Sequence, residues 1–259
     1  MMFQVFPELF EDILSILGYW DFILEGFIVT MWLYMWALMM GFFFGLLLAI
    51  LRQYGGKILS RIATGYIELV RGTPLLAQLF LFYFGPFSII AVLEAQNIPY
   101  IPIGGWSFDV SFTLLEKEII ITLLDHRTLI GLLTLGLNST AYQAEYLRGA
   151  ISSVGTGQLM AAQSLGMSRL SGIRYVVLPQ ALRRVIPAWS NEAAYLPKYT
   201  VVVWFIAVVE LFAMAHYIVT KLFLTSLTYI IVALIFLALI SSLSKILDII
   251  HKKTSIPGL

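Results

Sequence analysis

Long apolar stretches are the feature that most constrains this chain of 259 residues. Several of them exceed the ~20 apolar residues that a helix needs to cross a bilayer. Hydrophobic residues make up 60% of the sequence and charged residues only 12%, which excludes an ordinary soluble domain. Only helices or closed barrels satisfy the backbone in lipid, and the strand alternation of a barrel is absent. The sequence therefore predicts an all-α polytopic membrane protein.

Five transmembrane helices are predicted within one transmembrane domain over residues 1–259. They cover roughly residues 22–51, 62–87, 129–153, 182–211 and 222–247. An amphipathic segment within residues 1–20 is typical of an outer interfacial helix. Residues 86–128, with Pro99 and Pro102, are expected to form an outer loop region, and residues 155–179 a polar loop on the opposite side.

The basic residues are distributed unevenly between the two sides of this five-span topology. One side would carry Arg52, Lys57, Arg61, Arg148, Arg169, Arg174, Arg183, Arg184, Lys245, Lys252 and Lys253. The other would carry only Lys117, Arg127 and Lys221. By the positive-inside rule the first side is cytoplasmic, which places the N-terminus outside. Five spans are few for a transporter acting alone, so we expect a half-channel that a second subunit completes.

The loop within residues 157–179 combines polar and small residues between two apolar segments. Gly166 can adopt the left-handed conformation that ends a helix, and Ser168 can cap the helix that follows. Ala161, Ala162 and Gly166 recur at helical spacing, which predicts a shallow face that another protein can approach closely. On spacing alone, a plain surface helix pair explains the loop equally well.

Signatures of catalysis and of nucleotide binding are absent from the sequence. Residues 55–57, Gly-Gly-Lys, lack the upstream glycine and the following hydroxyl of a phosphate-binding loop. No Gly-x-Ser-x-Gly nucleophile turn occurs, and His126, His216 and His251 are scattered. We therefore interpret the histidines as boundary or packing residues, and we expect neither a metal site nor an enzyme.

Two polar stripes lie within the predicted spans, because spacings of i, i+4 and i+7 place three side chains on one helix face. The stripes are Asn138, Tyr142 and Glu145 on the third span, and Asn191, Tyr195 and Lys198 on the fourth. A charge at mid-bilayer costs roughly 2.5–3.5 kcal/mol, so Lys198 requires a partner or a wet cavity. Pro197 also leaves the carbonyl of Ala193 without its helical donor at similar depth. Discontinuous helices of this kind build midplane sites in transporters.

We expect the two stripes to line a translocation path. Lys198 would contact a carboxylate and Glu145 an ammonium group, while the asparagines and tyrosines would fix the orientation of the substrate. The alternative is a structural ion pair between Lys198 and an acidic residue such as Glu192.

A helix break follows Glu68 and Arg71, which stand at i, i+3 and can pair. Gly72 and Pro74 interrupt the second predicted span directly afterwards. One interpretation assigns Glu68, Arg71 and Pro74 to a gate or hinge on the path. The other is a kink with an arginine that snorkels toward the cytoplasmic face.

Three further blocks make a family resemblance specific: Glu68–Gly85, Ala141–Gln158 and Leu178–Lys198. Together with the loop, they resemble the polar amino acid permeases (the histidine, glutamine and arginine type) of bacterial and archaeal ATP-binding-cassette importers. The resemblance covers most of residues 30–211. The chain departs from the family pattern at Met160, where the loop usually has Glu, in the apolar run of residues 199–202, at Pro197 before Lys198, and in its longer outer region.

The resemblance implies a type I importer permease fold, multi-pass in a prokaryotic cell (inner) membrane. A cytoplasmic ATP-binding-cassette ATPase dimer would grip Gly157, Gln158, Ala161, Ala162, Leu165, Gly166, Ser168 and Arg169. A second permease, as a homodimer or heterodimer, would complete the path, and an extracellular or periplasmic solute-binding protein would deliver a polar amino acid. The chain itself would bind no cofactor, because ATP is bound by the partner subunit, and no nucleic acid. The alternative function is an ATPase-independent membrane channel or scaffold subunit, which would leave the small-residue face of the loop unexplained.

Overall fold

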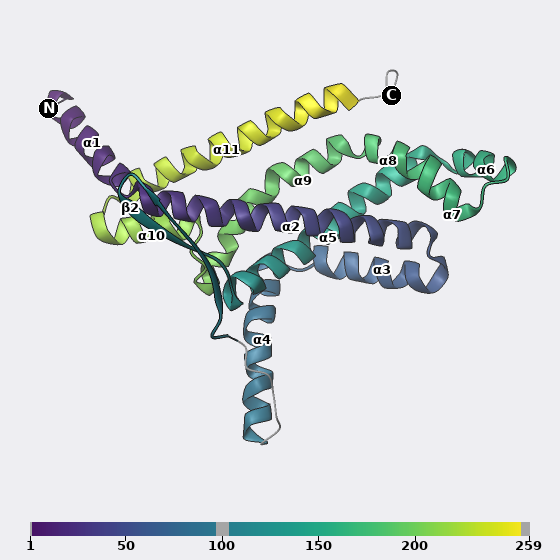
Figure 1. The fold of residues 1–259 in the computed structure, drawn as a ribbon, viewed down its shortest axis with the longest axis horizontal. Helices are drawn as coiled ribbons and strands as arrows, with labels where there is room; N and C mark the ends of the chain where they lie inside the picture. The colour runs from purple at the N-terminus through teal and green to yellow at the C-terminus, as the bar shows by residue number, and fades with distance from the viewer. Residues whose placement is uncertain (1, 97–103, 255–259) are drawn as a thin grey trace. The chain divides into compact units, whose positions relative to one another are not determined.

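The computed structural model describes residues 2–96 and 104–254 and consists mainly of helices, with one two-stranded sheet (Figure 1). Its elements are α1 (Met2–Leu17), α2 (Trp20–Tyr54), α3 (Gly56–Arg71), α4 (Leu75–Ala95), β1 (Ser107–Leu114), β2 (Lys117–Asp125), α5 (His126–Val154), α6 (Thr156–Ser164), α7 (Arg169–Gly172), the π-helical turn η1 (Ile173–Val177), α8 (Leu178–Arg184), α9 (Ile186–Tyr199), the 3-10 segment η2 (Thr200–Ile206), α10 (Leu211–Leu222) and α11 (Thr225–Thr254). Pro99 and Pro102 of the predicted outer loop lie outside the described residues.

Within the described residues, three helices are individually long and apolar enough to cross a membrane: α2, α4 and α11. A fourth span results if Ile186–Ile206 and Leu211–Leu222, which are bent by 56° at a short break, count together. The 29 residues of α5 cover the third predicted span, and at 1.5 Å per residue they are long enough to cross. Polar residues spread along the helix, among them Asn138, Gln143 and Glu145, make it too polar to be identified by hydropathy alone.

The second predicted span, residues 62–87, is divided between two helices. α3 ends at Arg71, and the apolar helix that follows begins only at Leu75. The fourth predicted span, residues 182–211, is also not one continuous α-helix. It changes to 3-10 geometry after Tyr199 and stops at Ala207, whose φ is +58°.

The described chain divides into two compact units. The first comprises Met1–Trp36, Leu75–Leu135 and Pro197–Leu239, and the second comprises Ala37–Pro74, Gly136–Leu196 and Ile240–Leu259. In the first unit, α2 approaches the start of α10 closely at Gly26, where a Cβ atom would lie 2.8 Å from the Cα of Leu211. The hydroxyl of Thr30 accepts a hydrogen bond from the Leu211 N–H at 3.1 Å. A core of Leu211, Ala215 and Val232 is built on this contact.

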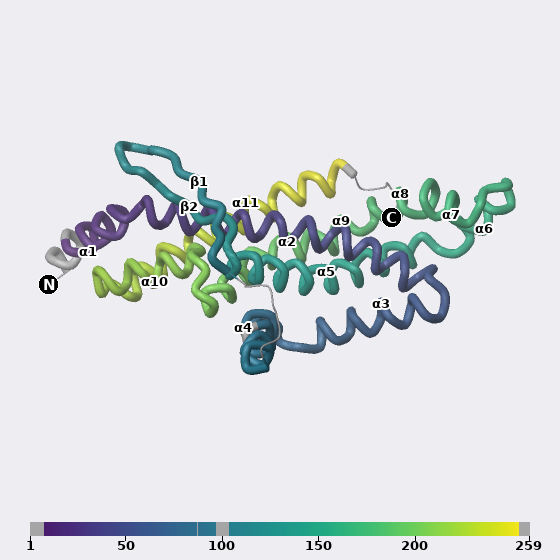
Figure 2. Tube along the Cα trace, turned by 60° about the horizontal axis from the view of Figure 1, so that its bottom comes forward, coloured from purple at the N-terminus to yellow at the C-terminus, as the bar shows by residue number. Residues whose placement is uncertain are grey.

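In the second unit, the later part of α2 packs against α5 through two glycines four residues apart. A Cβ atom at Gly45 would lie 3.0 Å from the backbone nitrogen of Ala144, and one at Gly41 would overlap the side chain of Gln143. Small residues at this spacing let helices pack closely in membranes. α3 runs back alongside the end of α2 (Figure 2), and the Ser60 hydroxyl donates to the carbonyl of Arg52 at 2.8 Å.

The outer region contains a β-hairpin in the first unit that the sequence analysis did not predict. β1 and β2 pair antiparallel, and their two-residue turn, Leu115 and Glu116, has positive φ angles of 49° and 65°. Turns of this kind match the twist of hairpin strands. The ammonium of Lys117 lies 3.0 Å from a carboxylate oxygen of Asp21 and connects the start of β2 to the start of α2. The β-branched run of Ile119–Thr122 was the available sequence signal.

Candidate functional site

The polar loop of residues 157–179 folds as a helix, a glycine turn and a second helix. α6 ends at Ser164, and Gly166 adopts a φ of +87°, which confirms the left-handed position predicted for it. Ser168 caps α7 as predicted, because its hydroxyl accepts a hydrogen bond from the Ser171 N–H at 3.2 Å. α7 then continues through the π turn, in which the Leu178 N–H donates to the Ile173 carbonyl. Pro179 has no N–H to offer in the next turn, so a locally widened helix is expected at this point.

The outer surface of this loop differs in part from the predicted small-residue face. Ala161 and Gly166 are exposed, but Ala162 is buried against Gly172, with only 4% of its surface accessible. Large apolar side chains point outward instead: Leu165 is 86% exposed and Leu170 is 76% exposed. Exposed apolar side chains next to small residues are typical of a surface that another protein covers.

Two residues of the loop connect it to neighbouring helices. The guanidinium of Arg169 lies 5.7 Å from the ring centre of Tyr54, at the end of α2. The Gln158 side chain accepts a hydrogen bond from Gln180 of α8 at 3.4 Å. The loop is therefore packed on α2 and α8.

The polar stripe on α5 leads into a cluster of arginines from three helices. The carboxylate of Glu145 accepts hydrogen bonds from Arg52 of α2 and from Arg148 one turn further along α5. Arg71 of α3 lies 3.9 Å from the same carboxylate, and its guanidinium stands 5.3 Å from the ring centre of Tyr142. Asn138, at the other end of the stripe, is buried at 7% exposure. Glu145, which was predicted to contact a substrate ammonium group, is thus held by protein cations.

The predicted pairing of Glu68 with Arg71 is replaced by two other contacts. Among the described residues, Glu68 lies 3.8 Å from Arg52, with 70% of its side chain exposed, so this contact contributes little to stability. Arg71 instead reaches Glu145 from the last turn of α3. Gly72 caps α3, and Pro74 precedes α4, so the predicted helix break is confirmed.

The stripe on α9 is accessible. Asn191 and Lys198 are exposed, and Tyr195 is 52% exposed. Lys198 lies in the last turn of α9, directly before the change to 3-10 geometry. Thr200 follows this change and donates its hydroxyl to the carbonyl of Pro197 at 2.7 Å. The interruption expected at Pro197 is displaced, because α9 continues through Pro197 and changes to 3-10 geometry only after Tyr199.

A buried polar network in the second unit was missed by the sequence analysis. The Ser139 hydroxyl donates to the carboxylate of Glu192 at 2.7 Å, and the Gln143 amide donates to Ser139 at 3.0 Å. The same amide donates to the carbonyl of Leu38 at 3.0 Å, while its oxygen accepts from the Trp189 indole at 2.7 Å. Ser139 and Gln143 are fully buried and stand at i, i+4, which was the available signal.

Within residues 2–96 and 104–254 there is no group of three or more His, Asp or Glu side chains that could hold a metal ion. The chemistry that the structure does offer consists of ion pairs, exposed polar stripes and an apolar loop surface. These features suit binding and conformational change.

Comparisons with known proteins agree with this description. Residues 41–256 match the family described as "Binding-protein-dependent transport system inner membrane component". The nopaline transport system permease protein NocM of Agrobacterium fabrum is 31% identical over 210 residues, which cover 81% of this chain and 78% of the relative. The glutamine transport system permease protein GlnP of Escherichia coli (strain K12) is 33% identical over 189 residues, 73% of each chain.

A solved structure described as an amino acid ABC transporter with histidines is 31% identical to this chain. It superposes with a TM-score of 0.72 and covers 93% of this chain and 97% of its own. The fold is therefore that of the type I importer permeases, with apolar helices in the inner membrane. The chain belongs to the family of binding-protein-dependent transport system inner membrane components.

Proposed function

We propose that this permease subunit carries a polar amino acid across the membrane in an ATP-driven importer. Relatives at 31% and 33% identity are named for transport of nopaline and glutamine, and the solved structure at 31% identity is an amino acid transporter. The observation that carries the proposal is the loop surface around Gly166, with its outward Leu165 and Leu170, in a subunit that is not itself catalytic.

The loop is the proposed docking site of a cytoplasmic ATPase dimer, to which ATP binds. α6 would present Gly157, Gln158 and Ala161, and the turn into α7 would present Leu165, Gly166, Ser168 and Arg169. The contact of Arg169 with Tyr54 supports transmission of movement to α2, because both side chains would shift together. Ala162 would act from within, by holding α6 against Gly172.

A second permease would complete the path, as a homodimer or a heterodimer, and a solute-binding protein would deliver the substrate from outside. The exposed stripe of Asn191, Tyr195 and Lys198 supports a role as path lining, with Lys198 contacting the substrate carboxylate. Asn138 and Tyr142 would extend the path along α5.

Glu145 is better supported as part of a gate than as a ligand for the substrate ammonium group. Two arginines already donate to its carboxylate, and a substrate would have to displace them. Arg71 and Glu68 would belong to the same gate, with Pro74 as its hinge. The helical path is interrupted between the end of α3 at Arg71 and the start of α4 at Leu75, which supports a hinge at this position.

Purification of the permease from its own cells, together with the subunits that bind it, tests the proposed complex with an ATPase. We expect an ATP-binding-cassette ATPase to co-purify and the reconstituted complex to import a polar amino acid only with ATP. Uptake without any ATPase would favour the alternative, an ATPase-independent channel or scaffold subunit.

Substitution in the reconstituted complex tests the path. Lys198→Met is expected to raise the KM for the substrate, while Glu145→Gln is expected to lower the transport rate more than it changes KM. Unchanged kinetics in both variants, with normal assembly, would remove these residues from the path and gate.

A further inference from the structure

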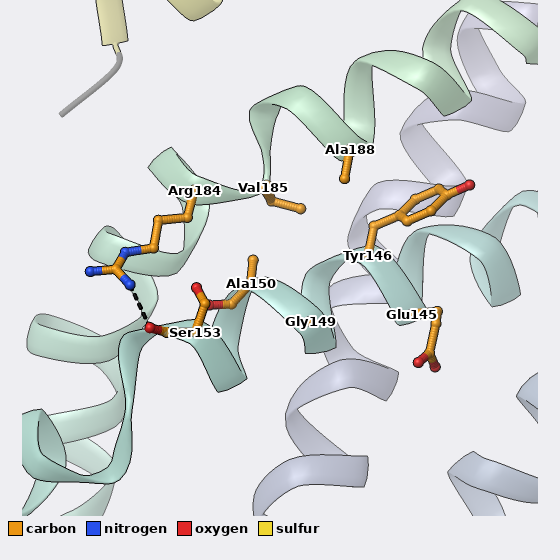
Figure 3. A pocket seen from close by; sticks show the side chains of 8 residues that line it. All are labelled: Glu145, Tyr146, Gly149, Ala150, Ser153, Arg184, Val185 and Ala188. Atoms are coloured by element: carbon orange, nitrogen blue, oxygen red, sulfur yellow. Dashed lines mark hydrogen bonds between the residues drawn. The ribbon is translucent and has the colours of Figure 1, made fainter. Parts of the chain in front are cut away.

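The second unit contains an open cavity of about 330 Å³ beside the cytoplasmic end of α5 (Figure 3). Its walls are formed by α5 and by the junction of α8 with α9, and Ala150, Val185 and Ala188 are among the apolar residues that line it. The space next to Gly149 is unfilled, because a Cβ atom built there would meet nothing within 4 Å. The cavity is large enough for a small organic group and is mostly apolar.

One end of the cavity is lined by Arg184. Its guanidinium donates a hydrogen bond through Nη1 to the carbonyl of Ser153, in the last turn of α5. Its Nε, by contrast, is buried and has no hydrogen-bond partner among the described residues. Buried donors in native structures nearly always have an acceptor, and a guanidinium binds anionic oxygens most strongly. The end of the cavity therefore favours an anion.

The carboxylate of Glu145 does not prevent an anion from binding at Arg184. Glu145 lines the far end of the cavity, and Figure 3 shows its carboxylate pointing away from Val185 and Ala188. Its charge is compensated by Arg52 and Arg148. No acidic side chain other than Glu145 lines this cavity among the described residues, so no carboxylate is available there for an ammonium group.

We propose that this cavity binds an anionic phospholipid of the cytoplasmic leaflet. The phosphate would accept hydrogen bonds from Arg184, and the glycerol and first acyl carbons would lie over Val185, Ala188 and Tyr146. Basic pockets on the cytoplasmic side of membrane helices are suited to such headgroups. The apolar wall distinguishes this ligand from free phosphate and from the carboxylate of a transported amino acid, which have no chain to bury against it.

The lipid would stabilise the joint between α5 and α8, which flank the loop of residues 157–179 on both sides. Arg184 and Ser153 already connect these two helices through one hydrogen bond. A phosphate on the same guanidinium would hold Arg184 in place. Anionic lipid is therefore expected to influence how movement of the loop reaches α5.

Native mass spectrometry of the purified full-length permease, with any subunits that co-purify, tests the proposal. Phosphatidylglycerol and phosphatidylcholine with identical acyl chains are titrated into wild type, Arg184→Gln and the matched control Arg183→Gln, which changes an exposed arginine on the same helix. Arg184→Gln should weaken phosphatidylglycerol binding roughly tenfold, the loss expected for one charge-assisted hydrogen bond. Phosphatidylcholine binding and the Arg183→Gln variant should change less than about twofold on the same scale.

Gly149→Leu provides a second variant that leaves Arg184 and its bond to Ser153 in place. The new side chain fills the cavity without a backbone clash, so phosphatidylglycerol binding should again fall about tenfold. An unchanged preference for phosphatidylglycerol in this variant would overturn the proposal, even if Arg184→Gln fails to fold.

Two competition experiments separate the sources of the anion. Millimolar inorganic phosphate, and separately the transported amino acid, are added to wild type loaded with phosphatidylglycerol. The lipid proposal predicts that neither displaces the lipid. Displacement by phosphate would identify a soluble-anion site, and displacement by the amino acid would identify part of the transport path; either result would overturn the proposal.

Discussion

The loop of residues 157–179 and the contact between α2 and α5 use glycine for opposite purposes. In the loop, Gly166 has a positive φ and open space around it, and it sets the backbone so that Leu165 faces outward. In the helix contact, Gly41 has ordinary helical geometry, but a Cβ atom would lie 2.2 Å from the Gln143 amide nitrogen. The first glycine is required by conformation and the second by space.

The same two regions invert the usual placement of polar and apolar groups. The loop exposes large apolar side chains, whereas the helix contact buries Ser139, Gln143 and Glu192 in hydrogen bonds. An exposed apolar surface gains stability only when a partner covers it, whereas a buried network stabilises the subunit by itself. We therefore expect changes in the loop to affect transport, and changes in the contact to affect the free energy of unfolding.

The largest expected effect is loss of transport in Gly166→Val. A left-handed conformation costs a residue with a Cβ atom roughly 1–2 kcal/mol, and more when it is β-branched, so the turn should reorganise. ATP-driven uptake in proteoliposomes should fall at least about tenfold, with the permease still folded in the membrane. Gly65→Val, on the exposed face of α3 with nothing within 4 Å, is the matched control. Wild-type uptake by Gly166→Val would contradict the claim that the loop conformation at Gly166 is needed for transport.

Gly41→Val should have the opposite profile. The added carbon overlaps the Gln143 amide and the Ser139 hydroxyl, and overpacking of this kind costs about 3 kcal/mol. Thermal unfolding in detergent should occur at a clearly lower temperature than in wild type, while Gly65→Val should unfold like wild type. An unchanged unfolding temperature would show that the helix contact tolerates separation.

Gln143→Leu tests the polar network without a large change in volume. It leaves the Trp189 indole without its acceptor and removes a donor to the Leu38 carbonyl, at a cost of about 2 kcal/mol. The measurement is again thermal unfolding, and Gln96→Leu, at an exposed position directly after α4, is the control. Equal unfolding temperatures in the two variants would argue that the network adds no stability.

The smallest effects concern the two helix caps, one in each unit. Asp125 accepts a hydrogen bond from the Thr128 N–H at 2.7 Å at the start of α5, and Ser168 caps α7 in the loop. Asp125→Ala should lower the free energy of unfolding by about 1 kcal/mol, whereas Ser168→Ala should mainly reduce transport. Isothermal denaturation and uptake assays on both variants measure the contrast, and equal stability losses in the two would contradict it.

The Asp125 cap also has a pH dependence. Burial raises the pKa of this carboxyl, but hydrogen bonds from Thr128 and from the neighbouring Arg127 together lower it by more than burial raises it. The pKa of Asp125 is therefore below its ordinary value. Its contribution to stability is therefore fully present above about pH 4 and is lost as the pH falls below that value. The difference in stability between wild type and Asp125→Ala should shrink in that range, and a constant difference would contradict the assignment.

Local patterns explain which features could be predicted. The turn at Gly166, the cap at Ser168 and the break at Pro74 depend on neighbours in the sequence, and the structure contains all three. The interruption expected at Pro197 comes only after Tyr199. The spacing of Glu68 and Arg71 allows them to pair, but the structure brings Glu68 near Arg52 and Arg71 near Glu145, because α2 and α5 lie within reach of α3. The outer hairpin was missed because its turn, at Leu115 and Glu116, contains neither glycine nor asparagine.

The pattern of residues along the chain is enough to predict a helical membrane protein, its orientation and the bend in its loop. These properties follow from apolar length, from the side on which arginine and lysine gather, and from backbone preferences of single residues. The packing of the helices, by contrast, is needed to see that Ala162 is buried, that Glu145 is enclosed by arginines, and that Gln143 connects α5 to α2 and α9. The contacts of Arg52 with Glu145 and of Gln143 with Leu38 and Trp189 join residues far apart in the chain, and their energies depend on distances that only the packed helices set.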